Sequence, residues 1–254
     1  MHSQTYCFDR AVAYEEIPAQ HRFIEAYFQF HNPCGHAIRV IPDGALDLTF
    51  LYGHGQPAVY VGGTALHGHE RSVPIDDRAF GVRLRPGIVL DCFRGSMGDM
   101  LDASLCLNDE PLFKALLEKI IAQPGLHRKA ALFQEAFTPW ATARLHPLTQ
   151  QLLQRLDHPG RRSVLEDLVQ ETGYSHTHAN RVFKSETGLS LKFYFDTRRI
   201  QRAIYLMERQ PIRHFQDFAA DLGFYDQPHF TKVFKNYTGY TPKKFYKMFN
   251  ITLK

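Results

Sequence analysis

Residues 173–188 read GYSHTHANRVFKSETG, and residues 223–239 read GFYDQPHFTKVFKNYTG. In the eight-residue cores RVFKSETG and KVFKNYTG, five positions are identical and a cation stands first in both. The cores are 51 positions apart. Self-similarity at a fixed offset indicates that one supersecondary unit is used twice.

The first copy has the pattern of a helix-turn-helix. Apolar residues recur at helical spacing from Val164 to Val169, and Gly173 follows where a helix would end with positive φ. Ser175 can cap a second helix that ends at Gly188. Two helices joined by a short turn that contains glycine form the helix-turn-helix layout.

The second copy has the same arrangement of apolar stripe, glycine stop and helix cap. Phe218 and Leu222 belong to an apolar stripe that ends at Gly223. Asp226 can cap the next helix, which is expected to end at Gly239. Thr241 and Pro242 then supply a cap and a first-turn proline for a last short helix.

An uninterrupted helical pattern at residues 190–209 separates the two units. A helix of roughly 19 residues is about 28 Å long at ~1.5 Å per residue. Neighbouring turns of the DNA major groove are about 34 Å apart. With the widths of the flanking units added, such a helix can place two recognition helices in successive grooves.

The charge is distributed unevenly. Residues 161–254 contain 16 Lys and Arg against 9 Asp and Glu, whereas the first 160 residues contain 14 against 17. A basic C-terminal third suits a polyanionic partner, and a solvated basic face is the alternative.

The C-terminal third resembles the DNA-binding domain of the AraC/XylS family of transcriptional regulators. The resemblance covers residues 163–247 and rests on GYSHTHANRVFKSETG, RRIQRAIYLM and LGFYDQPHFTKVFKNYTGYTPKKFY in that order. It implies that the second helix of each unit enters the major groove. The residues matched to base readout are Thr177, Asn180, Arg181, Gln227, Thr231 and Lys232, with His176 and His229 nearby.

The side-chain types at these positions suit readout, because Arg can pair with guanine and Asn or Gln with adenine. Lys232 can donate in the groove but lacks the planar fork of Arg181. The expected phosphate contacts are Ser175, Lys184, Lys235, Lys243 and Lys244.

Two positions depart from the repeat. Ala179 stands where the second unit has Phe230, which predicts a looser anchor for the first recognition helix. Pro228 lies in the first turn of the second recognition helix, where proline is tolerated.

The N-terminal half has a different pattern. From about Ala37 to Phe93, short β-branched runs alternate with turns such as PDG, GHGQP and RPG. This pattern predicts a small antiparallel barrel or sandwich. Helical patterns follow at residues 112–122, 128–145 and 147–156. The expected fold is therefore α+β: a β-rich, barrel-like domain with appended helices (residues 1–156), a hinge at 157–162, and an all-α domain of two helix-turn-helix units joined by a linker helix (residues 157–254).

IPDGALDLTF and GVRLRPG resemble N-terminal domains of a subgroup of the same family, which implies a module that senses a small molecule or dimerises. Arg83 and Arg85 alternate on a predicted strand and could bind an anionic ligand together. A salt bridge within the fold is the alternative.

The sequence supports catalysis and metal binding less well than it supports DNA binding. His67 and His69 could share a strand face, but the nearest carboxylate, Glu70, is directly adjacent to His69, so we expect no metal site. Asp43 and Asp47 are better suited to structural roles in a turn and at a strand end than to general acid–base catalysis. The four scattered cysteines are expected to be reduced and packed as small hydrophobic residues.

Together these observations predict a sequence-specific transcriptional regulator and not an enzyme. The expected partners are double-stranded promoter DNA, a small-molecule effector, RNA polymerase if the protein is an activator, and a second copy of the chain. No cofactor and no membrane contact are expected. The N-terminus lacks the pattern of a signal peptide, which suits a cytoplasmic protein. The alternative function is a cupin-like, metal-binding enzyme domain fused to a DNA-binding tail.

Overall fold

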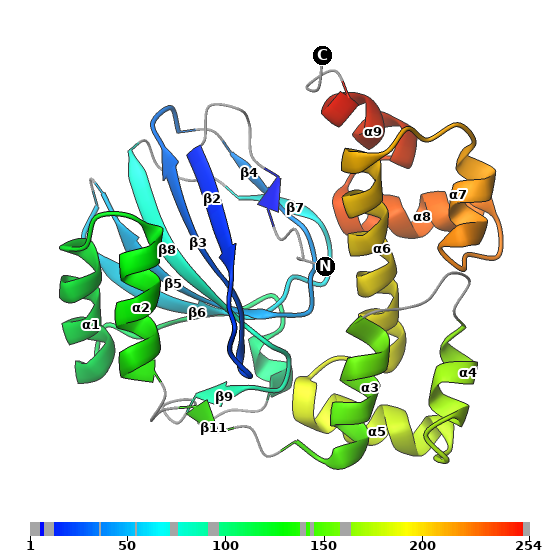
Figure 1. The fold of residues 1–254 in the computed structure, drawn as a ribbon, viewed down its shortest axis with the longest axis horizontal. Helices are drawn as coiled ribbons and strands as arrows, with labels where there is room; N and C mark the ends of the chain where they lie inside the picture. The colour runs from blue at the N-terminus through cyan, green and yellow to red at the C-terminus, as the bar shows by residue number, and fades with distance from the viewer. Residues whose placement is uncertain are drawn as a thin grey trace.

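The computed structural model describes residues 6–7, 13–35, 37–53, 55–71, 76–90, 97–137, 141–142, 145–157 and 164–250. A β-rich part and a helical part lie side by side, and the long helix α6 (Leu191–Arg209) runs along the side of the helical part that faces the strands (Figure 1). The expected α+β class is confirmed.

The main sheet has six antiparallel strands in the order β10-β6-β5-β8-β3-β2. Their bounds are Ser104–Cys106 (β10), Ala58–Gly62 (β6), Leu46–Tyr52 (β5), Asp77–Leu84 (β8), Ile24–Asn32 (β3) and Ala13–Pro18 (β2). A second sheet has the order β1-β4-β7, with bounds Tyr6–Cys7, Ile38–Val40 and His69–Arg71. A short ribbon joins β9 (Val89–Leu90) to β11 (Ala141–Thr142). Among the described strands the main sheet is open, so the domain is sandwich-like and not a closed barrel.

The two faces of the main sheet have different packing partners, because successive side chains along each strand point to opposite faces. Leu48 and Phe50 of β5 face helices α1 (Pro111–Ile121) and α2 (Leu126–Phe137), where Phe133 packs edge-on to Phe50. Leu51 of β5 packs instead with Phe28 and Ile38, towards the second sheet. The core of this domain therefore lies mostly beneath α1 and α2, and the opposite face holds the polar residues described below.

Strands β2 and β3 were not predicted from the sequence, which indicated strands only from about residue 37. The segment IEAYFQFHN, which contains three aromatic residues, forms β3. It contains no glycine or proline. Helix α2 also ends at Phe137, earlier than the predicted end at residue 145. Pro139 follows two residues later and lacks the N–H that a continuing helix would need.

The helical part contains the two predicted units. The first comprises α4 (Leu165–Gln170) and α5 (His176–Thr187), and the second comprises α7 (Phe215–Asp221) and α8 (Gln227–Thr238). The 19-residue helix α6 lies between them, as predicted, and α9 (Pro242–Asn250) follows the second unit. The predicted hinge lies mostly in residues 158–163, outside the described residues.

Helix α3 (Pro147–Asp157) was assigned to the N-terminal domain from the sequence, but it packs against the first helix-turn-helix unit. Its Leu148, Leu152 and Leu156 are buried in one cluster with Ala179 and Phe183 of the first unit. We therefore propose that the boundary lies before α3 and not at residue 157. Ala179 is itself fully buried in the same cluster as these leucines.

The β-rich part contacts α6 and both units. Ile41 is fully buried in the core of the second unit, together with Ile200 and Ile204 of α6. Gln201 Nε2 donates a hydrogen bond to the Pro42 carbonyl at 2.9 Å. At the first unit, the 3₁₀ turn Met97–Met100 packs against the end of α5, which stops at Gly188 with φ 77°.

We predict that this packing makes Gly188 more sensitive to substitution than Gly173. Both have φ near 77°, so alanine costs about 1–2 kcal/mol at either position. A Cβ at Gly188 would lie 2.6 Å from the Met97 carbonyl oxygen, whereas a Cβ at Gly173 meets open space. Gly188→Ala should cost ~1–3 kcal/mol more, because backbone must move. Urea unfolding of the two variants measures this difference, and equal losses would contradict the contact.

Candidate nucleic-acid interface

The two recognition helices, α5 and α8, begin in the same way. Ser175 Oγ accepts a hydrogen bond from the His178 N–H at 3.3 Å, and Asp226 Oδ1 accepts one from the His229 N–H at 2.7 Å. Each cap satisfies an N–H that has no partner within its helix. Both predicted caps are confirmed, and Ser175 therefore has a structural role besides its expected phosphate contact.

The two helices also end alike. The hydroxyls of Thr187 and Thr238 each donate to the carbonyl four residues earlier at 2.8 Å, and Gly188 or Gly239 follows with φ 77°. Phe183 and Phe234 are fully buried in the two units. The identical buried phenylalanines and the glycines of the repeat thus hold the helices in place, and the copies differ at the expected base-readout positions, such as Arg181 and Lys232.

Most of the predicted readout side chains are exposed. Thr177 and Arg181 are four residues apart on α5, so they share one helix face. On α8, Gln227, Thr231 and Lys232 line one surface cleft together with Lys235. Gln227 and Lys232 are exposed and Thr231 is half-buried.

Asn180 has a structural partner that the sequence did not indicate. Its Oδ1 accepts a hydrogen bond from the Leu191 N–H at 2.9 Å, at the first turn of α6. The equivalent pair in the second repeat is Thr231 and Pro242, and proline has no N–H to satisfy. The hydrogen bond that Asn180 accepts therefore has no equivalent in the second unit.

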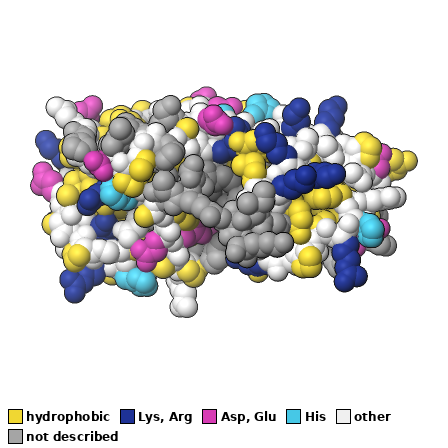
Figure 2. Space-filling view, turned by 90° about the horizontal axis from the view of Figure 1, so that it is seen from above, with side chains coloured by type: hydrophobic (Ala, Val, Ile, Leu, Met, Phe, Trp, Pro, Cys, Tyr) yellow, Lys and Arg dark blue, Asp and Glu magenta, His cyan; other side chains and the backbone are white. Residues whose placement is uncertain are grey.

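The expected phosphate contacts Lys184, Lys235, Lys243 and Lys244 are all exposed. Lys244 lies 4.8 Å from the centre of the Tyr240 ring, which orients its side chain near the start of α9. Figure 2 looks onto the α9 end of the helical part, where Lys and Arg side chains are more prominent than acidic ones. The basic charge of the C-terminal third is therefore largely on its surface.

Two arginines of the RRIQRAIYLM segment are an exception because they are buried. Arg199 lies 3.5 Å from the centre of the Phe224 ring and donates through Nε to the Leu222 carbonyl at 2.8 Å. Burial lowers the pKa of Arg199, and Asp196 opposes that shift. Arg198 Nε lies 3.5 Å from an Asp157 carboxylate oxygen. These residues fix the second unit and α3 to α6, and they are not available to DNA.

Sequence reasoning missed an aromatic position that both copies share. Tyr174 and Tyr225 precede the two caps and are 45% and 93% exposed. Tyr174 stacks on His178, whose Nδ1 lies 3.4 Å from Arg181 Nη2. The signal available in the sequence was a tyrosine directly before the cap in both repeats. The stack orients the guanidinium of Arg181, the best base-reading candidate.

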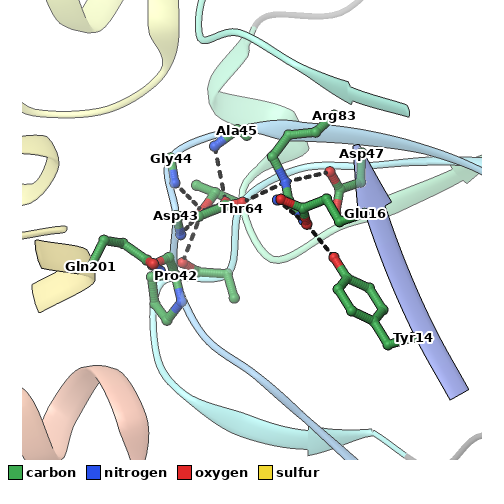
Figure 3. A network of polar contacts seen from close by, with 11 residues as sticks. Tyr14, Glu16, Pro42, Asp43, Gly44, Ala45, Asp47, Thr64, Arg83 and Gln201 are labelled. Atoms are coloured by element: carbon green, nitrogen blue, oxygen red, sulfur yellow. Dashed lines mark hydrogen bonds and ion pairs between the residues drawn. The ribbon is translucent and has the colours of Figure 1, made fainter. Parts of the chain in front are cut away.

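In the β-rich part, Arg83 is fully buried in a network of carboxylates (Figure 3). Its Nε lies 3.1 Å from Asp43 Oδ2 and 3.3 Å from Asp47 Oδ1, and its Nη1 lies 3.3 Å from Glu16 Oε2. Burial alone would lower the pKa of Arg83, but Asp47 and Asp43 raise it well above its usual value. This is the intramolecular salt bridge that the sequence left open as an alternative. Arg85 lies just beyond the end of β8, which stops at Leu84.

A cavity of about 310 Å³ lies between the two sheets next to this network. Its walls include Asp43, Asp47, Thr49, Tyr60 and Arg71. Because Thr49 and Asp47 alternate with Leu48 and Phe50, they point away from α1 and α2.

The predicted metal candidates do not converge on one point. His67 and His69 are exposed, and His69 Nδ1 lies 3.2 Å from the His67 carbonyl oxygen. Within the described ranges, no three His, Cys, Asp or Glu side chains gather as metal ligands would. Cys34 and Cys106 are exposed, so the prediction that these thiols pack in a core was wrong. The rest of the chain's cysteine side chains lie outside the described residues.

Two caps, two buried phenylalanines and two exposed faces at a fixed separation define a bipartite helix-turn-helix protein. The family described as "Helix-turn-helix domain" matches residues 168–248. The multiple antibiotic resistance protein MarA of Escherichia coli is 32% identical over 109 residues, which are 42% of this chain and 80% of MarA. The Msm operon regulatory protein of Streptococcus mutans is 34% identical over 83 residues, which are 33% of this chain and 30% of that protein.

Among solved structures, ToxT from Vibrio cholerae aligns with 95% of this chain and 99% of its own, at 11% identity and a TM-score of 0.46. The chain belongs to the AraC/XylS family of DNA-binding transcription regulators. None of the helices in the described part of the chain is long and apolar enough to cross a bilayer.

Asn180 and Thr231 provide a matched test of the first unit. We predict that Asn180→Ala lowers the free energy of unfolding by about 1–3 kcal/mol, because the Leu191 N–H loses its acceptor. Thr231→Ala should cost less than ~1 kcal/mol, because Pro242 needs no acceptor. Chemical denaturation of both variants checks this. An equal loss in the two would show that the Asn180 hydrogen bond contributes nothing specific.

Proposed function

We propose that the protein reads double-stranded promoter DNA at two successive major-groove segments, one with α5 and one with α8. The observation that carries this proposal is the pair of identically capped recognition helices with different exposed side chains on either side of a 19-residue helix. Different readout faces imply a site whose two halves differ in sequence. A selection from a pool of random DNA, at roughly physiological salt, tests the proposal.

The contacts divide into two classes under this proposal. Base readout falls to Thr177, Arg181, Gln227, Thr231 and Lys232, with a smaller share for Asn180, whose oxygen is already engaged. Lys184, Lys235, Lys243, Lys244 and the Ser175 hydroxyl contact phosphates. Base contacts give sequence preference, whereas phosphate contacts give affinity that falls with salt.

Arg181→Ala and Lys184→Ala separate the two classes. Arg181→Ala should cost about 1–3 kcal/mol on the selected site and relax the preference at one position, because a bidentate base contact is lost. Lys184→Ala should weaken all sequences alike and lower the salt dependence, because it removes one phosphate contact. Fluorescence anisotropy with matched and mismatched duplexes measures both effects, and the reverse pattern would refute this division.

We further infer that a small-molecule effector binds in the cavity between the two sheets and controls DNA binding. Asp43 lines the cavity and belongs to the turn that contacts α6. Thr64, another wall residue, accepts a hydrogen bond from the Gly44 N–H at 3.0 Å. The neighbouring residues Ile41 and Pro42 contact α6 directly. An occupant that moves this turn would therefore act on the helix that separates the two recognition helices.

Filling the cavity should uncouple the effector from DNA. Thr49 is half-buried in the cavity wall, so Thr49→Phe occupies the space without cutting the Arg83 network. We expect the variant to bind the selected DNA as the wild type does, and to lose any change in affinity that a metabolite library produces in the wild type. A response that persists in Thr49→Phe would place the effector elsewhere.

The remaining partners follow from the regulatory role. RNA polymerase is the expected partner if the protein activates, and a second copy of the chain could occupy a repeated operator. A DNA partner suits the cytoplasmic localisation that we propose. The proposal contains no catalytic step, and one relative that supports it is named an operon regulatory protein.

A further inference from the structure

A second cleft, of about 790 Å³, opens where the turn between α1 and α2 overhangs the main sheet. The turn contributes residues 121–125, and the sheet contributes Gln29, Tyr52 and Arg78 among others. Tyr52 alternates with Leu51 and lies on the α1–α2 face, away from the cavity between the sheets. The cleft is therefore separate from the effector cavity.

Lys129 forms the inner wall of the cleft and is only 6% exposed. Its Nζ lies 3.3 Å from Gln29 Oε1, contacts the Tyr52 hydroxyl, and stands 5.0 Å from the centre of the Tyr52 ring. Both partners are neutral, and within the described residues Lys129 makes no ion pair. A buried ammonium without a carboxylate is unfavourable unless something else supplies the negative charge. An ammonium also has three N–H donors, and these two contacts use only two.

The position of Lys129 in its helix adds to this cost. The first turn of α2 contains no acidic residue and carries His127, Arg128 and Lys129 in a row. The N-terminus of a helix has a partial positive charge, so cations there are disfavoured and anions are favoured. Local rules are most often broken at functional sites. An anion in the cleft would relieve both the burial of Lys129 and its unfavourable place in the helix.

A second cation stands beside Lys129. Arg78 on β8 pairs in register with Tyr52 on β5 and with His31 on β3, so the three lie in one row across neighbouring strands. Arg78 is exposed and lines the cleft, and no ion pair engages it within the described part of the chain. The cleft also contains one carboxylate, Glu15, whose Oε2 accepts from Gln29 Nε2 at 2.7 Å. The cleft thus contains two cations, Lys129 and Arg78, and one carboxylate, which already accepts a hydrogen bond from the Gln29 amide.

We propose that this cleft binds a small organic anion, with its carboxylate or phosphate group between Lys129 and Arg78. Gln29 and Tyr52 hold the ammonium in position, and Ile121 and Pro124 give an apolar wall for the rest of the ligand. The anion site is separate from the proposed effector cavity and from the DNA-binding surface. An experiment can therefore contradict the anion site without contradicting the proposed function, and the reverse.

Inorganic phosphate and benzoate serve as probes for the two head groups, in thermal-shift and calorimetric titrations of the full chain. Lys129→Met removes the charge and keeps a side chain of similar size. Arg78→Gln removes a charge at an exposed position. Lys119→Met, on the exposed side of α1, is the matched control. Because phosphate can also bind the exposed cations of the helical part, the informative result is the difference in response between the variants and the wild type.

We expect at least one probe to raise the melting temperature of the wild type and of Lys119→Met. Affinity should fall about tenfold or more in Lys129→Met and in Arg78→Gln, as loss of a charge-assisted contact implies. Without a probe, Lys129→Met should be at least as stable as the wild type. A response to benzoate alone, or to phosphate alone, identifies the head group. If neither probe acts, or if the response is unchanged in both Lys129→Met and Arg78→Gln, the proposal is overturned.

Discussion

Helix α6 must bury its surface against three neighbours at once, and the rest of the structure depends on this constraint. Twelve of its 19 residues are buried. A typical surface helix buries a single apolar stripe. One side of α6 contacts the first unit through Leu191 and Phe195, and another contacts the second unit through Ile204 and Met207. The turn around Pro42 occupies a third side. The separation of the recognition helices is thus fixed by packing as well as by helix length.

The β-rich part contributes to this geometry at both ends of α6. Its 3₁₀ turn meets Gly188 at the end of α5, and the Gly68 N–H donates to the Asn236 carbonyl at the end of α8 at 3.2 Å. Arg39 stacks 4.6 Å from the centre of the Tyr240 ring, just after α8. A domain that touches the C-terminal end of both recognition helices is well placed to change their relative orientation. Under the proposed function, an occupant of the cavity in the N-terminal domain would act on DNA binding through these contacts, without touching the DNA itself.

Much of the helical part could be predicted because local signals agree there. Caps such as Ser175 and Asp226, glycine stops and helical apolar stripes all indicate the same boundaries. The boundary that we propose before α3 is harder to predict. Leu148 and Leu152 of α3 pack with residues about 30 positions later in α5, and an apolar stripe in the sequence does not indicate its partner. Asn180 had the correct type for base readout, but its bond to Leu191 appears only when α5 and α6 are placed together. Arg83 likewise could not be assigned until Glu16, Asp43 and Asp47 were brought around it from different strands.

The central claim is that one chain reads two DNA segments at a fixed separation, and half-site spacing tests it most directly. The selected operator is altered by inserting about 5 bp, or about 10 bp, between its halves, where ~10–10.5 bp make one turn. Since both units pack against the same helix α6, either insertion should reduce affinity to that of a single half-site. The shorter insertion also turns the second half to the opposite face of the duplex. Affinity that is unchanged by both insertions would contradict the account.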